Sequence, residues 1–182
     1  MKKCTVFLII ISLLALSLTA CSNDNDKQLE VPFLERPDTN LDFWIAENVD
    51  NVDFSEYTYK GLMGGWSYYG KEYDIARDEY NQPIAPEHYV LYTVTNFPDY
   101  SDKAEHITDI RITDPEIYIY GSLTVESSFE DFKRVMEQNG FEIVEKSEYS
   151  CRMKKGKFTI SLTPHHHLLI MVEVENREGI YF

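Results

Sequence analysis

The segment from Tyr149 to Leu162 constrains the fold of this chain more than any other, because it alternates between apolar and polar residues on both sides of Lys155-Gly156. A two-residue turn at Lys155-Gly156 pairs apolar residues on one face: Met153 with Phe158, Cys151 with Ile160 and Tyr149 with Leu162. The other face then pairs polar residues: Lys154 with Lys157, Arg152 with Thr159 and Ser150 with Ser161. Because a one-residue slip would mix the two faces, the pattern predicts an antiparallel hairpin with one buried face.

A helix is predicted before this hairpin. Ser127 and Glu130 form a capping-box pair, and Gly140 supplies a stop. An apolar stripe lies between them, formed by Phe129, Phe132, Val135 and Met136. Strands are predicted at 141–146 and 168–175. The chain from Ser127 onward is therefore expected to form a helix followed by four antiparallel strands.

The preceding part of the chain predicts the same kinds of element. Leu41, Trp44, Ile45 and Val49 lie at helical offsets and suggest a short helix. Strands are expected from about Trp66, at 88–97 and at 106–113. The predicted fold class is α+β, a two-layer arrangement of an antiparallel sheet packed with one or two helices. The order also suggests two similar halves, each an α-helix followed by strands, by analogy with some small envelope lipoproteins and β-lactamase-inhibitor-like proteins.

The N-terminus has the features of a signal peptide. Lys2 and Lys3 precede an apolar stretch at 6–18, which is shorter than the roughly 20 residues that a membrane helix needs. Leu18-Thr19-Ala20-Cys21 resembles the lipobox of bacterial lipoproteins. The resemblance implies cleavage before Cys21 and lipidation of its sulfur with diacylglycerol, of which palmitate is a typical acyl chain. The alternative is an ordinary secreted protein in which Cys21 lies near the cleavage site.

These signals divide the chain into three parts. Residues 1–20 are the predicted signal peptide, 21–40 a lipidated polar tether, and 41–182 a single extracytoplasmic domain on the outer face of the cell membrane. Segments at 43–49, 68–73, 112–115 and 127–132 resemble a family of uncharacterised Gram-positive-type lipoproteins. The resemblance implies a cell-envelope location and brings no activity with it.

Composition limits the partners that we expect. The chain carries a formal charge of −14, and removal of residues 1–20 would take away two lysines and no acid. Such a surface repels phosphate backbones and anionic headgroups, which argues against nucleic-acid binding and against docking on acidic lipid. Cleavage and lipidation would leave Cys151 as the only free thiol, which we expect to be a buried structural residue.

Tyrosine is concentrated between Tyr57 and Tyr100, where nine of the thirteen lie. Tyr and Trp offer large, rigid contact areas with a polar group, which suits binding of sugars, peptides or proteins. The candidate ligand-binding residues are Trp66, Tyr68, Tyr69, Tyr73 and Tyr92. The alternative is that these rings cover a thin two-layer core.

The run His165-His166-His167 is a candidate metal site. Adjacent residues of an extended segment point to opposite sides, so only His165 and His167 are expected to share a site. His88 or His106 could complete it. The alternative is a polar hairpin loop.

No nucleophile motif, phosphate-binding loop or dinucleotide fingerprint is present, and no cofactor is expected. Near pairs of acids are expected by chance in so acidic a chain. We therefore expect a non-catalytic surface lipoprotein that binds a protein, peptide or glycan. The alternatives are an accessory lipoprotein of an envelope complex, with an exposed apolar patch at Ile170, Val172 and Val174, or an envelope hydrolase.

Overall fold

The structure, a computed structural model, describes residues 29–55, 57–63, 66–70, 76–82, 84, 88–96, 104–147 and 150–173. Within these residues the chain forms one short 3-10 helix, one α-helix and eight strands. In chain order they are η1 (Val49–Asn51), β1 (Thr58–Met63), β2 (Trp66–Gly70), β3 (Val90–Asn96), β4 (Glu105–Ile112), α2 (Phe129–Gln138), β5 (Glu142–Lys146), β6 (Cys151–Lys155), β7 (Phe158–Thr163) and β8 (His167–Val172). The predicted α+β class is confirmed.

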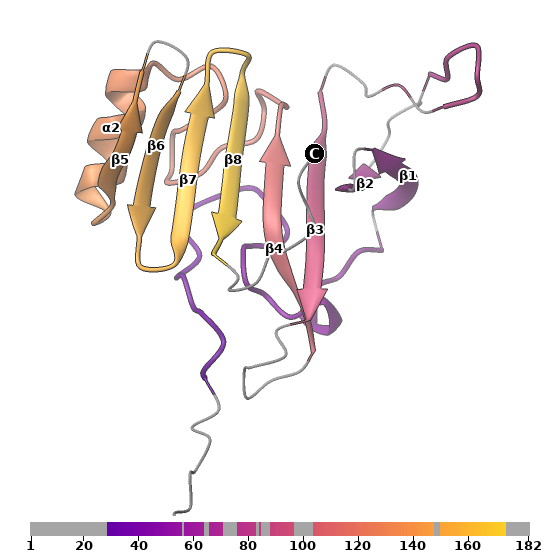
Figure 1. Cartoon of the computed structure of the whole chain (residues 1–182), viewed down its shortest axis with the longest axis horizontal. Helices are drawn as coiled ribbons and strands as arrows, with labels where there is room; N and C mark the ends of the chain where they lie inside the picture. The colour runs from indigo at the N-terminus through magenta and orange to yellow at the C-terminus, as the bar shows by residue number, and fades with distance from the viewer. Residues whose placement is uncertain are drawn as a thin grey trace, which may run out of the picture.

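These eight strands form one antiparallel sheet with the order β1-β2-β3-β4-β8-β7-β6-β5 (Figure 1). Each half of the chain contributes a four-stranded meander, β1 to β4 and β5 to β8. The two meanders join where their last strands, β4 and β8, pair antiparallel at the centre of the sheet. The order of elements thus repeats, except that a 3-10 helix stands in the first half where α2 stands in the second.

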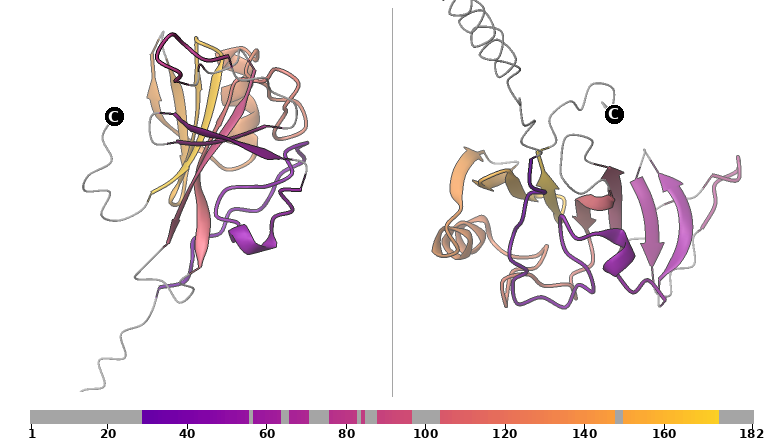
Figure 2. Two further views of the ribbon diagram at one scale, coloured as in Figure 1. Left: turned by 90° about the vertical axis from the view of Figure 1, so that its right-hand side faces the viewer. Right: turned by 90° about the horizontal axis from the view of Figure 1, so that it is seen from below.

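The core lies on one face of the sheet. Both α2 and the segment from residue 30 to 55 cover this face (Figure 2). Alternate residues of β6, β7 and β8 point into it, and Met153, Ile160 and Ile170 are fully buried there. The expected exposed patch on the last strand is wrong, because Ile170 and Val172 belong to this core. Val174 lies outside the described residues.

The helix α2 forms as predicted, but its N-cap lies one residue later than expected. Ser128, and not Ser127, is the N-cap, and its hydroxyl accepts from the backbone N–H of Asp131 at 3.1 Å. Glu130 pairs instead with Lys146 of the neighbouring strand. Gly140, with φ +80, follows the C-cap as predicted, and Phe132 and Met136 bury the apolar stripe.

The β6–β7 hairpin has the predicted faces with a register shifted by two residues. Cys151 pairs with Leu162 and Met153 with Ile160, so the turn residues are Gly156-Lys157 and not Lys155-Gly156. Gly156 has φ +58, and a two-residue hairpin turn requires a positive φ at its first central position. Side chains alternate with a period of two, so a two-residue shift leaves every apolar residue on the core face.

The helix predicted from Leu41 to Val49 is wrong. Only Val49–Asn51 is helical there, as η1. Ala46 has φ +66 and donates its N–H to the Ile107 carbonyl of β4 at 2.7 Å, which breaks the helical path. Leu41, Phe43, Trp44 and Ile45 are all buried, so the apolar spacing reports burial in an irregular segment.

The folded domain begins earlier than the predicted boundary at residue 41. Leu34 is only 7% exposed and belongs to the core, and Val31 packs against it. Thr39 and Asn40 donate to carbonyls of Tyr118 and Glu116. The described part of the predicted tether is therefore a packed segment of the domain.

Candidate functional site

Tyr92 is a core residue. It is 3% exposed, its ring stacks on Phe54 with centroids 5.1 Å apart, and it meets Phe43 edge-on at 5.0 Å. The alternative interpretation of the tyrosines therefore holds for this one, since a buried ring has no surface to offer a ligand.

The other candidates of the Tyr-rich segment are placed only in part. Tyr68 and Tyr69 lie in β2, paired with Leu91 and Val90 of β3. Trp66 begins the same strand and pairs with Met63 of β1. The side chains of these β2 residues, and Tyr73 altogether, lie outside what the structure describes, so their binding role stays a prediction.

The histidine run forms a tight turn and not an extended segment. Thr163 pairs with His167, which leaves a three-residue loop at 164–166 between β7 and β8. His166 ends this loop with φ +56, the left-handed conformation that such loops need at their last position. The strict alternation that we expected for His165 and His167 therefore does not apply.

This turn joins three other segments around an open pocket with a volume of about 460 Å³. We call it the histidine pocket. It is lined by His88, Tyr89, Thr113, Pro115, Val125, Glu126, His165, His166 and His167. His88 precedes β3 and Thr113 follows β4, so the pocket lies at the end of the sheet where β7 ends and β8 begins (Figure 1).

The polar groups of the histidine pocket are held in position by the fold. Thr113 and Tyr89 are tied together, since the Tyr89 N–H donates to the Thr113 hydroxyl at 2.9 Å. The Nδ1 of His166 lies 3.3 Å from the Val125 carbonyl. A carbonyl only accepts, so this contact requires the proton on Nδ1 and leaves Nε2 of the neutral ring as an acceptor.

The surroundings of His167 disfavour its protonated form. Burial lowers the pKa of His167 below its ordinary value, and the positive charges of Arg111, His165 and His166 lower it further. A neutral imidazole presents one donor and one acceptor. With Glu126 and Thr113 nearby, the pocket offers both kinds of hydrogen-bonding group to a ligand.

The histidine pocket is not a formed metal centre. Among the described residues, no three His, Cys, Asp or Glu side chains come together closely enough to hold a metal ion. His88 does lie at the same pocket as His165 and His167. His106 does not, because it is buried beside the first half's irregular segment with Nδ1 2.8 Å from the Ala46 carbonyl.

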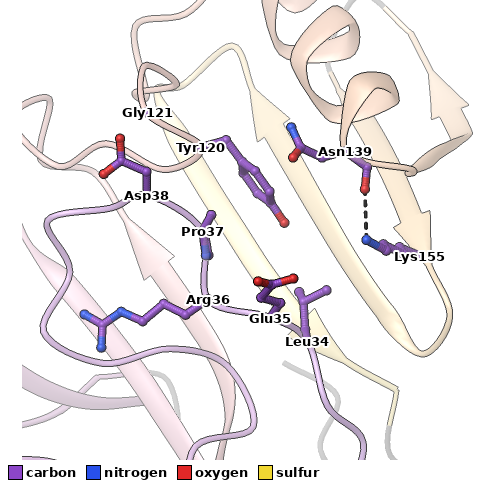
Figure 3. A pocket seen from close by; sticks show the side chains of 9 residues that line it. All are labelled: Leu34, Glu35, Arg36, Pro37, Asp38, Tyr120, Gly121, Asn139 and Lys155. Atoms are coloured by element: carbon purple, nitrogen blue, oxygen red, sulfur yellow. Dashed lines mark hydrogen bonds between the residues drawn. The ribbon is translucent and has the colours of Figure 1, made fainter.

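A second hollow, the Tyr120 cleft, lies beside the segment that precedes Leu41 (Figure 3). Its volume is about 430 Å³, and it is lined by Leu34, Glu35, Arg36, Pro37, Asp38, Tyr120, Gly121, Asn139 and Lys155. The Tyr120 hydroxyl points into it, between Glu35 and Asn139 (Figure 3). The Tyr120 ring is fixed by edge contacts with Trp44 and Phe141, at 6.4 and 6.0 Å between centroids.

The charged groups of this cleft are largely engaged. Lys155 Nζ donates to the Asn139 carbonyl at 2.9 Å. Arg36 turns away, toward the Asp42 carbonyl at 3.3 Å and Glu47 at 3.6 Å. Burial raises the pKa of Tyr120, so its phenol stays protonated and acts as a donor. The cleft can hold a polar group, and it lacks an activated base.

Three groups considered for catalysis, Cys151, Glu130 and Asp131, are buried or engaged in structural contacts. Cys151 is buried, as predicted, and burial raises the pKa of its thiol, which keeps the sulfur a poor nucleophile. Lys146 hydrogen-bonds Glu130 and lowers the pKa of that carboxyl. The Asp131 carboxylate accepts from the hydroxyl of the N-cap Ser128 at 2.8 Å and pairs with Arg134 at 2.5 Å. These acids are explained by structure.

The sequence did not predict that the residues of either hollow come together. Tyr120 and Gly121 stand in a connection, and nothing in their neighbourhood predicted contact with residues 34–38. The one available signal was Gly121: with φ +76, a side chain there would bring Cβ to 3.3 Å from Asp38. For the histidine pocket, His88 was considered as a partner of the run, but its approach depends on strand order.

Comparisons with protein-family models, with curated proteins and with solved structures gave no match to this chain. In the part of the chain that the structure describes, no helix has the length and apolar character required to cross a membrane. The lipoprotein resemblance therefore stays a prediction from the sequence.

Proposed function

We propose that this chain is a lipid-anchored, extracytoplasmic binding domain that holds a protein, peptide or glycan without chemical change. The N-terminal sequence supports the anchor: an apolar segment ends in Leu18-Thr19-Ala20-Cys21 and is followed by polar residues. Two acyl chains hold a protein stably on a bilayer without a protein span.

The observation that carries the binding role is the position of the histidine pocket. The described chain begins beside the β6–β7 turn, at the opposite end of the sheet (Figure 1). The six residues of β7 connect that turn to the histidine turn and span about 20 Å, at about 3.3 Å per residue. An anchor at Cys21 would therefore attach to the domain at the end of the sheet opposite the histidine pocket.

The chemistry of the pocket supports a ligand with several hydrogen-bonding groups. Imidazoles and a carboxylate line a volume in the range of ligand sites. Peptide backbones and sugars both present donors and acceptors alternately. A non-catalytic role is supported by the buried, deactivated Cys151 and by acids that are already paired.

The proposal is tested by photocrosslinking in intact cells from a reactive residue placed at Glu126, on the rim of the histidine pocket. Adducts are identified by mass as protein, peptide or glycan. The His88→Ala/His165→Ala variant removes two exposed imidazoles and should lower adduct yield at least tenfold. The matched control, Glu137→Ala/Gln138→Ala, changes two exposed residues of α2 and should leave the yield unchanged.

Equal yields from the two double variants, or no adduct in the parent chain, would contradict the pocket as the binding site. Thermal unfolding of both variants is measured alongside. A matched unfolding temperature separates loss of the site from loss of the fold.

A further inference from the structure

The end of the sheet opposite the histidine pocket exposes apolar side chains. Phe33 is 82% exposed and Leu29 is 45% exposed, and both lie within the segment that the sequence predicted as the tether. Burying a phenylalanine side chain is worth about 1.5–3 kcal/mol. A single exposed apolar residue is ordinary, but two of this size at one place indicate a surface that is covered by something.

Phe33 lies beside basic groups. Phe33 lines a hollow of about 300 Å³ together with Glu30, Pro32, Leu34 and the β6–β7 residues Lys155, Gly156, Lys157 and Phe158. Two bases and one acid therefore surround the hollow, in a chain with a formal charge of −14. Apolar residues beside lysines are typical of surfaces that lie in the interface of a bilayer.

The position in the chain points to the same partner. Leu29 is eight residues from Cys21, so the chain between them reaches at most about 29 Å even when fully extended. If lipid anchors Cys21, the anchor holds Leu29 and Phe33 close to the bilayer. Tethering of this kind raises the effective concentration to the millimolar range, so a weak contact is sufficient.

We infer that this end of the domain, which we call the tether end, docks on the bilayer itself. Phe33 and Leu29 insert among the headgroups, and Lys155 and Lys157 lie beside lipid phosphates. At the apolar hollow, Lys155 and Lys157 outnumber Glu30, which reduces the repulsion that the acidic remainder of the chain would otherwise meet. The inference rests on the proposed anchor. It adds an orientation: the long axis of the strands stands away from the membrane, with the Tyr120 cleft near the bilayer and the histidine pocket outermost.

The two hollows of the tether end share residues, which supports the orientation. Leu34 and Lys155 line both the apolar hollow and the Tyr120 cleft (Figure 3). The Lys155 amine is held by the Asn139 carbonyl, so the base keeps its position at the turn. The lining is therefore preorganised on the β6–β7 turn and on the C-terminal end of α2.

The test places the photoreactive analogue p-benzoylphenylalanine at position 33 of the full chain. The chain is reconstituted in vesicles of phosphatidylcholine and phosphatidylglycerol, irradiated, and examined for lipid adducts by mass. The matched control carries the same residue at position 80, where Tyr80 is 75% exposed and lies in the 76–84 segment on the opposite side of the molecule from the chain start (Figure 1). Docking predicts at least tenfold more lipid adduct at position 33 than at position 80.

Equal yields at the two positions, only protein adducts at position 33, or no adduct there would overturn the docking.

The same mass spectra show whether Cys21 carries acyl chains. If it does and position 33 gives no lipid adduct, docking fails while the anchor stands. If Cys21 is not acylated, the proposed anchor fails; the Cys4→Ser chain is then coupled through Cys21 to a maleimide-bearing lipid, and the two positions are compared again.

Discussion

Each turn at the ends of β7 contains one residue with a positive φ, and the two residues differ in type. Gly156 has φ +58 at the tether end, and His166 has φ +56 in the histidine turn. A left-handed conformation costs an ordinary L-residue about 1–2 kcal/mol and costs glycine almost nothing. A Cβ at Gly156 would meet nothing within 4 Å, so glycine there serves the backbone alone.

At His166 the side chain, and not the backbone conformation, explains the residue type. Glycine or asparagine would suit its conformation better, yet a histidine stands there and directs its imidazole toward the Val125 carbonyl at the histidine pocket. Backbone strain that is retained at one position is often associated with a functional side chain. The residue at the tether-end turn is therefore explained by its backbone conformation, and the residue at the histidine turn by its side chain.

The largest expected effect tests which end of the molecule faces the membrane. Cys21→Ala removes the only site for lipid in the predicted lipobox, and we expect the membrane-bound fraction to fall more than tenfold. Cell fractionation and fatty-acid labelling measure it. If the variant stays fully in the membrane fraction, Cys21 is not the anchor. The end of the domain near Cys21 would then no longer be identified as the end that faces the membrane.

Tyr92→Ala tests whether binding belongs to the Tyr-rich strands instead of the histidine pocket. Loss of a buried ring that packs on Phe43 and Phe54 should lower the free energy of unfolding by about 3–5 kcal/mol. Urea unfolding gives the value. Tyr92→Phe keeps the ring and should cost far less; if it abolishes ligand binding in a stable domain, Tyr92 has a functional role that burial does not explain.

Gly156→Ala should lower the free energy of unfolding by about 1 kcal/mol, because alanine must adopt the left-handed conformation. The expected steric contribution is nil. Gly156→Asn is the matched control, since asparagine tolerates this conformation. A loss above about 3 kcal/mol for alanine would mean that the turn is packed against something further.

His166→Asn should change the free energy of unfolding by only a few tenths of a kcal/mol. The gain from a better left-handed residue and the loss of the Val125 contact oppose each other. Ligand capture at the histidine pocket should fall at the same time. If the variant instead loses more than about 1 kcal/mol and still captures ligand, His166 is a structural residue and the contrast between the turns disappears.

The smallest effect concerns pH. The lowered pKa of His167 means that the unfolded chain binds its proton more readily than the folded one. This residue's contribution is therefore complete above its ordinary pKa of 6.5 and is lost as the pH falls through that value toward the lowered one. His167→Gln should lose stability less steeply between pH 7.5 and 5.5. Parallel pH profiles of parent and variant would contradict it.

Local patterns were sufficient for the second half of the fold. The stripe at Phe132 and Met136 with Gly140 after it predicted α2, and two-residue alternation predicted the faces of β6 and β7. The errors came from choices of similar local energy. Ser127 and Ser128 are both good caps, and a register shifted by two preserves both faces, so only the turn geometry of Gly156 and the contact of Glu130 with Lys146 distinguished them.

The first half was less predictable, because its helical spacing at Leu41 to Val49 had no cap or stop to support it. There, the Ala46 N–H donates to the Ile107 carbonyl of β4 and the Glu47 carbonyl accepts from the Ile107 N–H, and these bonds compete with helix formation. Such contacts join residues about 60 positions apart, and no local pattern contains them. For the same reason the sequence did not predict that Leu34 is a core residue, because its burial depends on the strands that follow it.

Local sequence patterns were sufficient to predict the α+β class, the amphipathic faces of α2 and the β6–β7 hairpin, and an anchor at Cys21. Each follows from neighbours within a few residues, through side-chain period, turn chemistry or a contiguous motif. The tertiary structure alone decided that β4 and β8 join the two meanders, that Tyr92 is core, and that His88 lies at the same pocket as His165 to His167. Strand order brings these residues together, and strand order is set by long-range burial of the whole sheet face.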